Sequence, residues 1–262
     1  MRGTRLGRGA FDETVNYAER LQGVTASVVI SPVNETPSAF VDPFWFHTEN
    51  PSFRSGGRLG LDARDTYGLR IWGKRERWAF DWTYAHQSGR YANRAVNAWA
   101  LFAVQTVTLS TQGWKPRVAT RVDLASGGGT YGSGVVKGFN QLYASSGYLG
   151  DGLFLSTSNL ALITPGLFAN PTATTSVSLE YGFARRLTSS DAAYGGLMRP
   201  YAGTHNVPGH SIGRLLRLGT SWTPRKSLTV FANFEYLAAG AVLQRAHLPS
   251  GSYGQVGFTY RK

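Results

Sequence analysis

Charged side chains recur at every second position in several amphipathic segments of this 262-residue chain. The positions that share the polar side of these segments are Arg70, Lys74, Asp81, Arg117, Arg121, Asp123, Glu180, Arg217 and Glu235. Guanidinium and ammonium groups spread out in this way bind anions weakly at many places, and interspersed carboxylates hold the arginines extended. The alternative is that these charges only neutralise one another inside a polar interior. Either way the chemistry is weak ionic binding.

Motifs for catalysis, cofactors and metals are weak or missing in the sequence. Gly127, Gly129 and Gly132 spell GxGxxG, but the residues that follow are too rich in glycine and serine to open the helix that a dinucleotide site needs. The histidines form no HExxH motif, no GxSxG elbow occurs, and there is no cysteine for a thiolate metal site or a disulfide. We therefore predict no cofactor, no metal and no enzymatic activity, with an esterase at the rim of a barrel as an alternative.

The elements that must position the charges are amphipathic strands. In "YGLRIWGKRERWAFDWTYAHQSGR", residues 67–90, large apolar side chains fall on one side and polar ones on the other with a period of two. The apolar side holds Tyr67, Leu69, Ile71, Trp78, Phe80, Trp82 and Tyr84. The break "KRER" is short enough for a hairpin turn, so the stretch predicts a hairpin with an aromatic face and a charged face.

Composition favours a membrane β-barrel over an ordinary soluble domain. Charged residues make up 16% of the chain, below the roughly 25% that is typical of soluble domains, and aromatic residues make up 13%. No apolar run approaches the roughly 18 residues of a membrane-spanning helix, whereas a spanning strand needs only about ten alternating residues. We therefore expect lipid on the outside of a barrel, with Trp78, Trp82, Trp114, Trp222 and Tyr236 in its interfacial girdles. Trp72 and Trp99 are expected to face inward.

The net charge of +12 indicates an anionic partner. The arginines are spread over the predicted strands rather than clustered on a helix, so nucleic acid is not the expected partner. The first residues, "MRGTRLGRGAFDET", contain no apolar signal-peptide core.

About eleven strands are predicted, and short turns alternate with long loops. The strands cover residues 10–20, 24–32, 67–73, 78–87, 94–108, 117–126, a strand from 159 to a turn at 170–171, and 174–186; the last three contain residues 216–222, 228–236 and 256–260. The first two are joined by a tight turn at Gln22-Gly23. The longest loops are residues 34–65, 127–156, 188–209 and 239–249, and a modest loop covers residues 88–93. Outer-membrane barrels combine short periplasmic turns with long extracellular loops. An odd strand count leaves the termini on opposite sides, so residues 1–262 are expected to form a single, N-terminally truncated barrel domain. A soluble β-sandwich is the alternative, because its strands also alternate.

Several segments resemble the alginate export family of bacterial outer-membrane porins. The resemblance is carried by "GLRIWGKRERWAFDWTYAHQSGR", "RVDLASGGG", "FNQLYASSGYLGDGLFLSTSNL", "SSDAAYGGLMRP" and "LTVFANFEYLAAG", in that order. The chain departs from the family in having Gly128 after "ASG", where an acidic residue is frequent, and in ending on Arg261 and Lys262 after Tyr260.

The resemblance implies an antiparallel all-β transmembrane barrel, of which this chain would supply the last eleven of eighteen strands. It also implies passive passage of an anionic exopolysaccharide or other anionic solutes through a lumen lined by Arg and Lys, in the bacterial outer membrane. The expected partners are the anionic polysaccharide or small anions, outer-membrane lipid and lipopolysaccharide, and the barrel assembly machinery. A general small-solute porin is the alternative.

Overall fold

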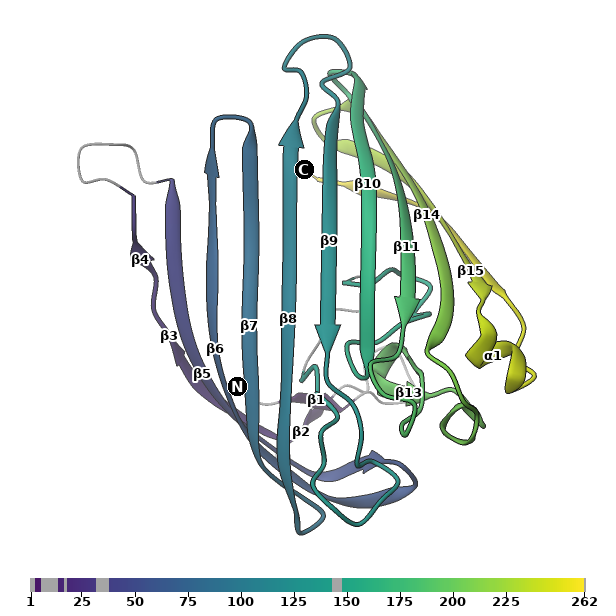
Figure 1. Ribbon diagram of the computed structural model, residues 1–262. Helices are drawn as coiled ribbons and strands as arrows, with labels where there is room; N and C mark the ends of the chain where they lie inside the picture. Colours follow the sequence, from purple (N-terminus) through teal and green to yellow (C-terminus); the bar gives the residue numbers. More distant parts are fainter. Residues whose placement is uncertain (1–2, 6–13, 17, 32–37, 143–147, 262) are drawn as a thin grey trace.

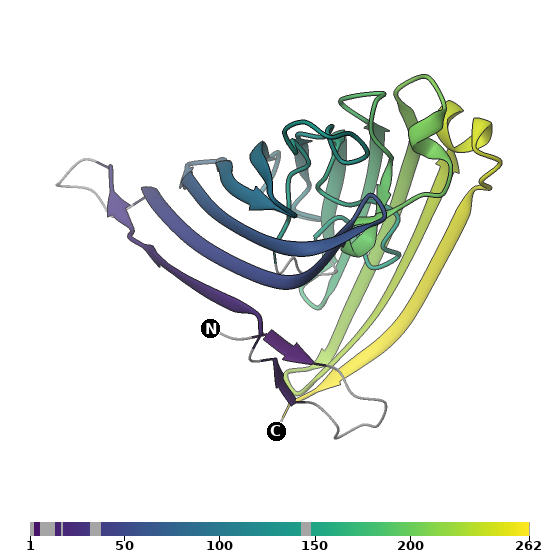
Figure 2. The same cartoon turned by 90° about the horizontal axis from the view of Figure 1, so that it is seen from below.

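The computed structural model is an antiparallel sheet that is strongly curved (Figures 1 and 2). It describes all residues except 1–2, 6–13, 17, 32–37, 143–147 and 262. The principal strands are β3 (Arg20–Thr25), β5 (Ala39–Ser55), β6 (Arg58–Arg75), β7 (Trp78–Tyr91), β8 (Arg94–Thr108), β9 (Arg117–Ala125), β10 (Leu160–Thr172), β11 (Thr175–Arg185), β14 (Ser211–Arg225), β15 (Leu228–Ala239) and β16 (Gly251–Tyr260).

Each principal strand pairs with its neighbours in the chain, in the order β3-β5-β6-β7-β8-β9-β10-β11-β14-β15-β16. The short β4 (Val28–Val29) also pairs with β5, which brings the sheet to twelve strands. Two separate ladders join β1 (Gly3–Arg5) to β2 (Thr14–Asn16) and β12 (Tyr194–Gly195) to β13 (Arg199–Pro200). The predicted all-β antiparallel architecture with about eleven strands is confirmed.

The first strands differ from the prediction. The expected loop at residues 34–65 contains β5 and the first part of β6, which turn tightly at Gly56 and Gly57 with positive φ angles of 55° and 79°. Glycine adopts this backbone conformation without steric cost. The expected tight turn at Gln22-Gly23 is wrong, because both residues lie within β3. The loop predicted at residues 88–93 is a two-residue turn at Ala92-Asn93.

The two ends of the sheet differ in their connections. At one end, uppermost in Figure 1, the turns are residues 76–77, 109–116, 173–174 and 226–227; we call it the short-turn end. At the opposite, long-loop end lie residues 126–159, 186–210 and 240–250, with η1 (Gly196–Met198), η2 (Thr204–Asn206) and α1 (Ala241–Arg245). The predicted alternation of short and long connections therefore holds from β8 onward. None of the described helices is both long and apolar enough to cross a membrane.

The two faces of the sheet differ in polarity, as the period of two predicts. The outer face carries exposed apolar side chains along most strands, including Tyr67, Leu69, Tyr84, Ile163, Leu167, Phe183, Leu218, Trp222, Phe234, Phe258 and Tyr260. We call the opposite face inner, because loop 126–159 packs against it through Phe139 and Tyr148. Two apolar clusters, around Leu162 and Leu215 and around Ala98 and Ala100, fill the inner face toward the long-loop end.

Candidate functional site: charged pairs on the inner face

The structure brings the predicted charged residues to one face of the sheet. Asp81 lies opposite Trp72 and Val104 in the ladders, and Val104 lies opposite Arg121. Further along the sheet, Glu180 on β11 pairs with Gly166 on β10, and Gly166 pairs with Ala119 on β9. Arg217 is paired with Glu180 on one side and Glu235 on the other. Alternation along each strand then places all nine residues on the inner face.

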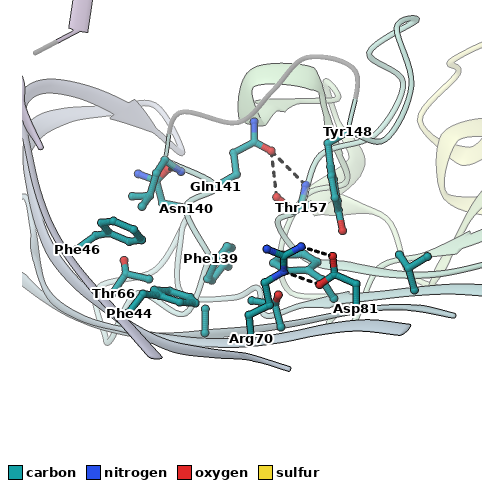
Figure 3. Close-up of a pocket in the computed structure, with 15 residues that line it drawn as sticks. Phe44, Phe46, Thr66, Arg70, Asp81, Phe139, Asn140, Gln141, Tyr148 and Thr157 are labelled. Carbon is teal, nitrogen blue, oxygen red and sulfur yellow. Dashed lines mark hydrogen bonds and ion pairs between the residues drawn. The ribbon is translucent and has the colours of Figure 1, made fainter. Parts of the chain in front are cut away.

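Arg70 and Asp81 form the first pair, between β6 and β7 (Figure 3). The Arg70 Nε and Nη2 atoms donate to the two carboxylate oxygens of Asp81 at 2.7 and 2.6 Å. Asp42 on β5 lies 3.8 Å from the guanidinium and also accepts a 2.6 Å hydrogen bond from the Trp72 indole. The Trp72 ring stacks on Phe40 and lies under Arg70. This two-pronged geometry holds the guanidinium in one orientation.

Arg121 and Asp123 form a second pair within β9, covered by loop 126–159. The Arg121 Nε atom lies 3.0 Å from Asp123 Oδ2, in an ion pair without hydrogen-bond alignment. Tyr148 covers this pair, since its ring lies 4.1 Å from the Arg121 guanidinium carbon and its hydroxyl donates to Asp123 at 2.7 Å. Burial, together with the negative charge of Asp123, raises the pKa of Tyr148 well above its usual value. The phenol is therefore a permanent donor at physiological pH.

Arg217 and Glu180 form the third pair, across β11 and β14, at 2.5 Å. Glu235, on the other side of Arg217, accepts hydrogen bonds from the backbone amides of Asp151 and Gly152 at 2.7 and 3.1 Å. The neighbouring Gly150 has a φ of 128°, which favours glycine, and a Cβ added there would lie 2.5 Å from the Glu235 carboxylate. Glu235 thus attaches loop 126–159 to the far side of the sheet.

Lys74 and Arg117 are the basic residues of this set that form no ion pair with a carboxylate in the described part of the chain. Arg117 reaches only the side-chain oxygen of Asn170, at 3.3 Å, and its Nε atom is buried without a partner. Both residues lie toward the short-turn end. The five basic residues of the set are matched in number by Asp42 and the four predicted carboxylates. The formal charges of these ten residues therefore cancel, and Lys74 and Arg117 are the cations among them that have no carboxylate partner.

A fourth ion pair, which is fully buried, also holds loop 126–159 on the inner face. Arg64 donates from Nε to Asp62 at 2.7 Å and from Nη1 to the Gly138 carbonyl at 2.9 Å. Asn140 donates to Asp62, and its backbone is bound by Gln87 through two hydrogen bonds. Between this loop and strands β5–β8 lies a cavity of about 460 Å³, lined by Phe44, Phe46, Phe102, Phe139 and the Arg70–Asp81 pair (Figure 3). The loop therefore occupies space above the inner face.

Some of these contacts escaped the sequence analysis. Asp42 lies in the segment 34–65 that the sequence predicts to be a loop, and neither Tyr148 nor Arg64 shows a local pattern that marks it as an inner-face contact. Trp99, expected to face inward, lies on the outer face, because its neighbours Ala98 and Ala100 are fully buried on the inner face. Among the predicted girdle residues, Trp78, Trp114 and Trp222 are exposed near the short-turn end.

Gly127, Gly129 and Gly132 lie in a loop segment without a helix. Gly128, beside them, donates its backbone N–H to the buried Asp191 carboxylate at 2.6 Å, which ties this segment to loop 186–210. Within the described residues, no group of three or more His, Asp or Glu side chains is arranged to hold a metal ion.

Comparison with known proteins gives one family match. The model of the family described as "Alginate export" matches residues 37–254. No curated protein matches the chain. Among solved structures, the one described as "NanC porin structure in rhombohedral crystal form" shares 8% identity and covers 93% of this chain and 99% of its own, with a TM-score of 0.42, which is too distant to inform function. Because the family match spans most of its length and agrees with the all-β fold, the chain belongs to the alginate export family.

Proposed function

We propose that the protein passes an anionic exopolysaccharide, or other anionic solutes, through a lumen formed by the inner face. The observation that carries this proposal is the row of Arg–carboxylate pairs that crosses the sheet from β5 to β15. A polymer in transit requires many weak contacts and no tight one, and arginines already held by carboxylates offer such contacts. Family membership supports the same function, and a transporter of this kind needs no catalytic residue.

The preference for anions is assigned to Lys74 and Arg117. The three paired arginines contribute little net field, because each has a carboxylate within about 3 Å. Lys74 is exposed and Arg117 lacks an acidic partner among the described residues, so these two are the cations whose field no adjacent carboxylate offsets. Bacterial outer-membrane lipid is the proposed environment of the outer face. Lipopolysaccharide and the barrel assembly machinery are proposed partners.

We further propose that residues 1–262 form one domain and that additional strands complete the barrel. The sheet ends at β16, which pairs only with β15 among the described strands. An open edge of backbone donors and acceptors is unstable in lipid, so a pore requires it to be paired. Strands from an N-terminal part of the same protein would provide that pairing.

The test is the reversal potential of the protein in planar bilayers under a salt gradient, with the protein expressed from its complete reading frame. We expect anion selectivity that falls in the Lys74→Gln, Arg117→Gln double variant. Arg214→Gln, an exposed arginine at an outer-face position of β14, is the matched control and should leave selectivity unchanged. Cation selectivity of the native protein, or passage of neutral and anionic oligosaccharides at equal rates, would favour a general small-solute porin.

A further inference from the structure

The rim at the short-turn end is strongly basic. At or next to its described turns lie Arg75, Arg77, Lys115, Arg225, Lys226 and Arg261, all exposed, and among the described residues of these turns Glu76 is the acidic one. None of these six basic side chains forms a salt bridge within the described residues. The long-loop end also carries exposed basic residues, among them Arg54, Arg58, Arg90, Lys137, Arg199 and Arg245, together with the acidic Asp151 and Asp191. The short-turn rim differs from it in continuing directly into Lys74 and Arg117, which form no ion pair with a carboxylate in the described part of the chain.

Backbone contacts place these basic residues in two neighbouring groups. Thr108 donates its N–H to the carbonyl of Arg77, and Arg77 donates to the carbonyl of Leu109, so turn 76–77 lies beside the turn that contains Lys115. On the other side of the rim, Arg261 donates its N–H to the carbonyl of Ser227, next to Arg225 and Lys226. The uncharged turn at residues 173–174 separates the two groups.

The positive charge continues from the rim onto the inner face. Lys74 precedes Arg75 on β6, and Arg117 begins β9 directly after the turn that contains Lys115. The buried Nε of Arg117 has no hydrogen-bond partner, and Arg117 forms no salt bridge within the described residues. A cavity of about 320 Å³ lies next to Arg117, lined also by Arg121, Glu180, Thr106, Thr164 and Phe168. The outer face at this end carries the exposed rings of Trp78 and Trp222 instead.

We propose that the basic rim is the capture surface for the anionic polysaccharide, which it binds before the chain enters the lumen. This inference rests on the proposed function and adds the end of the molecule at which the polymer enters. A ring of one sign raises the local concentration of an oppositely charged polymer and speeds association by roughly 10- to 1,000-fold at low salt. Continuity with Lys74 and Arg117 directs the polymer inward, whereas anionic lipid headgroups would meet only the outer side of the rim.

The experiment measures how often an oligosaccharide of uronic acids blocks the current of single channels in neutral phosphatidylcholine bilayers. The variant is Arg75→Gln, Arg77→Gln, Lys115→Gln; a second variant, Arg225→Gln, Lys226→Gln, removes the other group. With the oligosaccharide on the short-turn side at 50 mM salt, each variant should lower the blockade frequency about tenfold. The difference in blockade frequency between the native protein and each variant should vanish near 1 M salt, because the Debye length is then only about 3 Å. Blockade duration should stay unchanged.

The matched control, Lys137→Gln with Arg199→Gln, alters the long-loop end and should leave capture from the short-turn side unchanged. Equal blockade frequencies in native protein and rim variants, or a loss that is the same from both sides, would overturn the capture surface. A loss seen only after anionic lipid is added would assign the rim to the membrane and also overturn it. If the native protein conducts but neither binds nor passes the oligosaccharide, the proposed function fails. If the oligosaccharide passes the native protein and the rim variants at the same rate, the proposed transport function is supported, but the proposal that the rim captures the polymer is wrong.

Discussion

Asp123 shows how single residues set the character of the inner face. Its carboxylate is fully buried, yet it contacts both the Arg121 guanidinium and the Tyr148 hydroxyl. A buried charge is tolerated only when it is paired and hydrogen-bonded. The two contacts come from β9 itself and from loop 126–159, so one carboxylate couples the wall of the proposed lumen to the loop above it.

Tyr148→Phe should therefore cost more stability than an ordinary tyrosine deletion. Removal of a hydrogen bond to a charged group costs about 1.5–3 kcal/mol, and removal of a neutral one about 1 kcal/mol. The free energy of unfolding, measured by urea titration of the folded protein, should reflect this difference. Tyr201→Phe is the control, because the Tyr201 hydroxyl donates only to the Phe154 carbonyl, at 2.9 Å. Equal losses in the two variants would show that the contact with Asp123 adds nothing.

The same tyrosine predicts a response to alkaline pH. Burial, followed by the charge of Asp123, raises the pKa of Tyr148 in the folded protein above the value of about 10 in an unfolded chain. The folded state then holds the proton more tightly. Its stabilising contribution is complete below about pH 10 and is lost as the pH rises further. Unfolding midpoints measured between pH 9 and 11.5 should fall less steeply in Tyr148→Phe than in the native protein; parallel curves would contradict the assignment.

At the scale of elements, loop 126–159 is the connection that determines the space above the sheet. Arg64 and Asp62 on β6 bind it near Gly138 and Asn140, and Glu235 on β15 binds it at Asp151 and Gly152. These anchors lie on strands that are far apart in the sheet order. The described parts of the loop therefore span the inner face from one side to the other, as a constriction would.

Release of one anchor should widen the pore. The double variant Asp62→Leu, Arg64→Met removes the buried ion pair and its bond to Gly138 together, so no unpaired charge is left behind. We expect higher single-channel conductance with little loss of stability. Arg64→Met alone is the comparison, and it should cost about 3–5 kcal/mol because Asp62 then remains buried without its cation. Unchanged conductance in the double variant would show that this anchor does not hold a constriction.

At the scale of the whole molecule, the sheet separates two solvents. Exposed apolar side chains such as Leu167, Phe183 and Phe258 cover the outer face, while ion pairs and polar loops occupy the inner one. In an ordinary soluble protein the apolar side chains lie inside and the charged ones outside. The opposite arrangement found here is stable only if lipid covers the outer face. The charges at the short-turn rim then lie between that lipid and the proposed entrance of the lumen.

A charge placed on the outer face should be costly and one on the inner face tolerated. Leu167→Arg introduces a cation at an outward position that is 55% exposed, and should lower the free energy of unfolding in lipid by about 2–4 kcal/mol. Ser178→Arg, on the neighbouring strand but facing inward opposite Phe168, is the control and should cost less. Reversed or equal costs, measured by unfolding in phospholipid vesicles, would reassign the two faces.

By itself the sequence determined the properties that depend on alternation along one strand. The period of two identified β7 to β11 and β14 to β16 closely, and it placed Arg70, Arg217 and the other charged residues on a common face. It did not identify β5, because Phe44, Trp45 and Phe46 put aromatic rings on both faces, and Pro43 and Pro51 resemble loop residues. Only the tertiary structure decided which carboxylate meets each arginine and where loop 126–159 lies. Those contacts join residues up to 84 positions apart, as between Asp151 and Glu235, and no local periodicity records them.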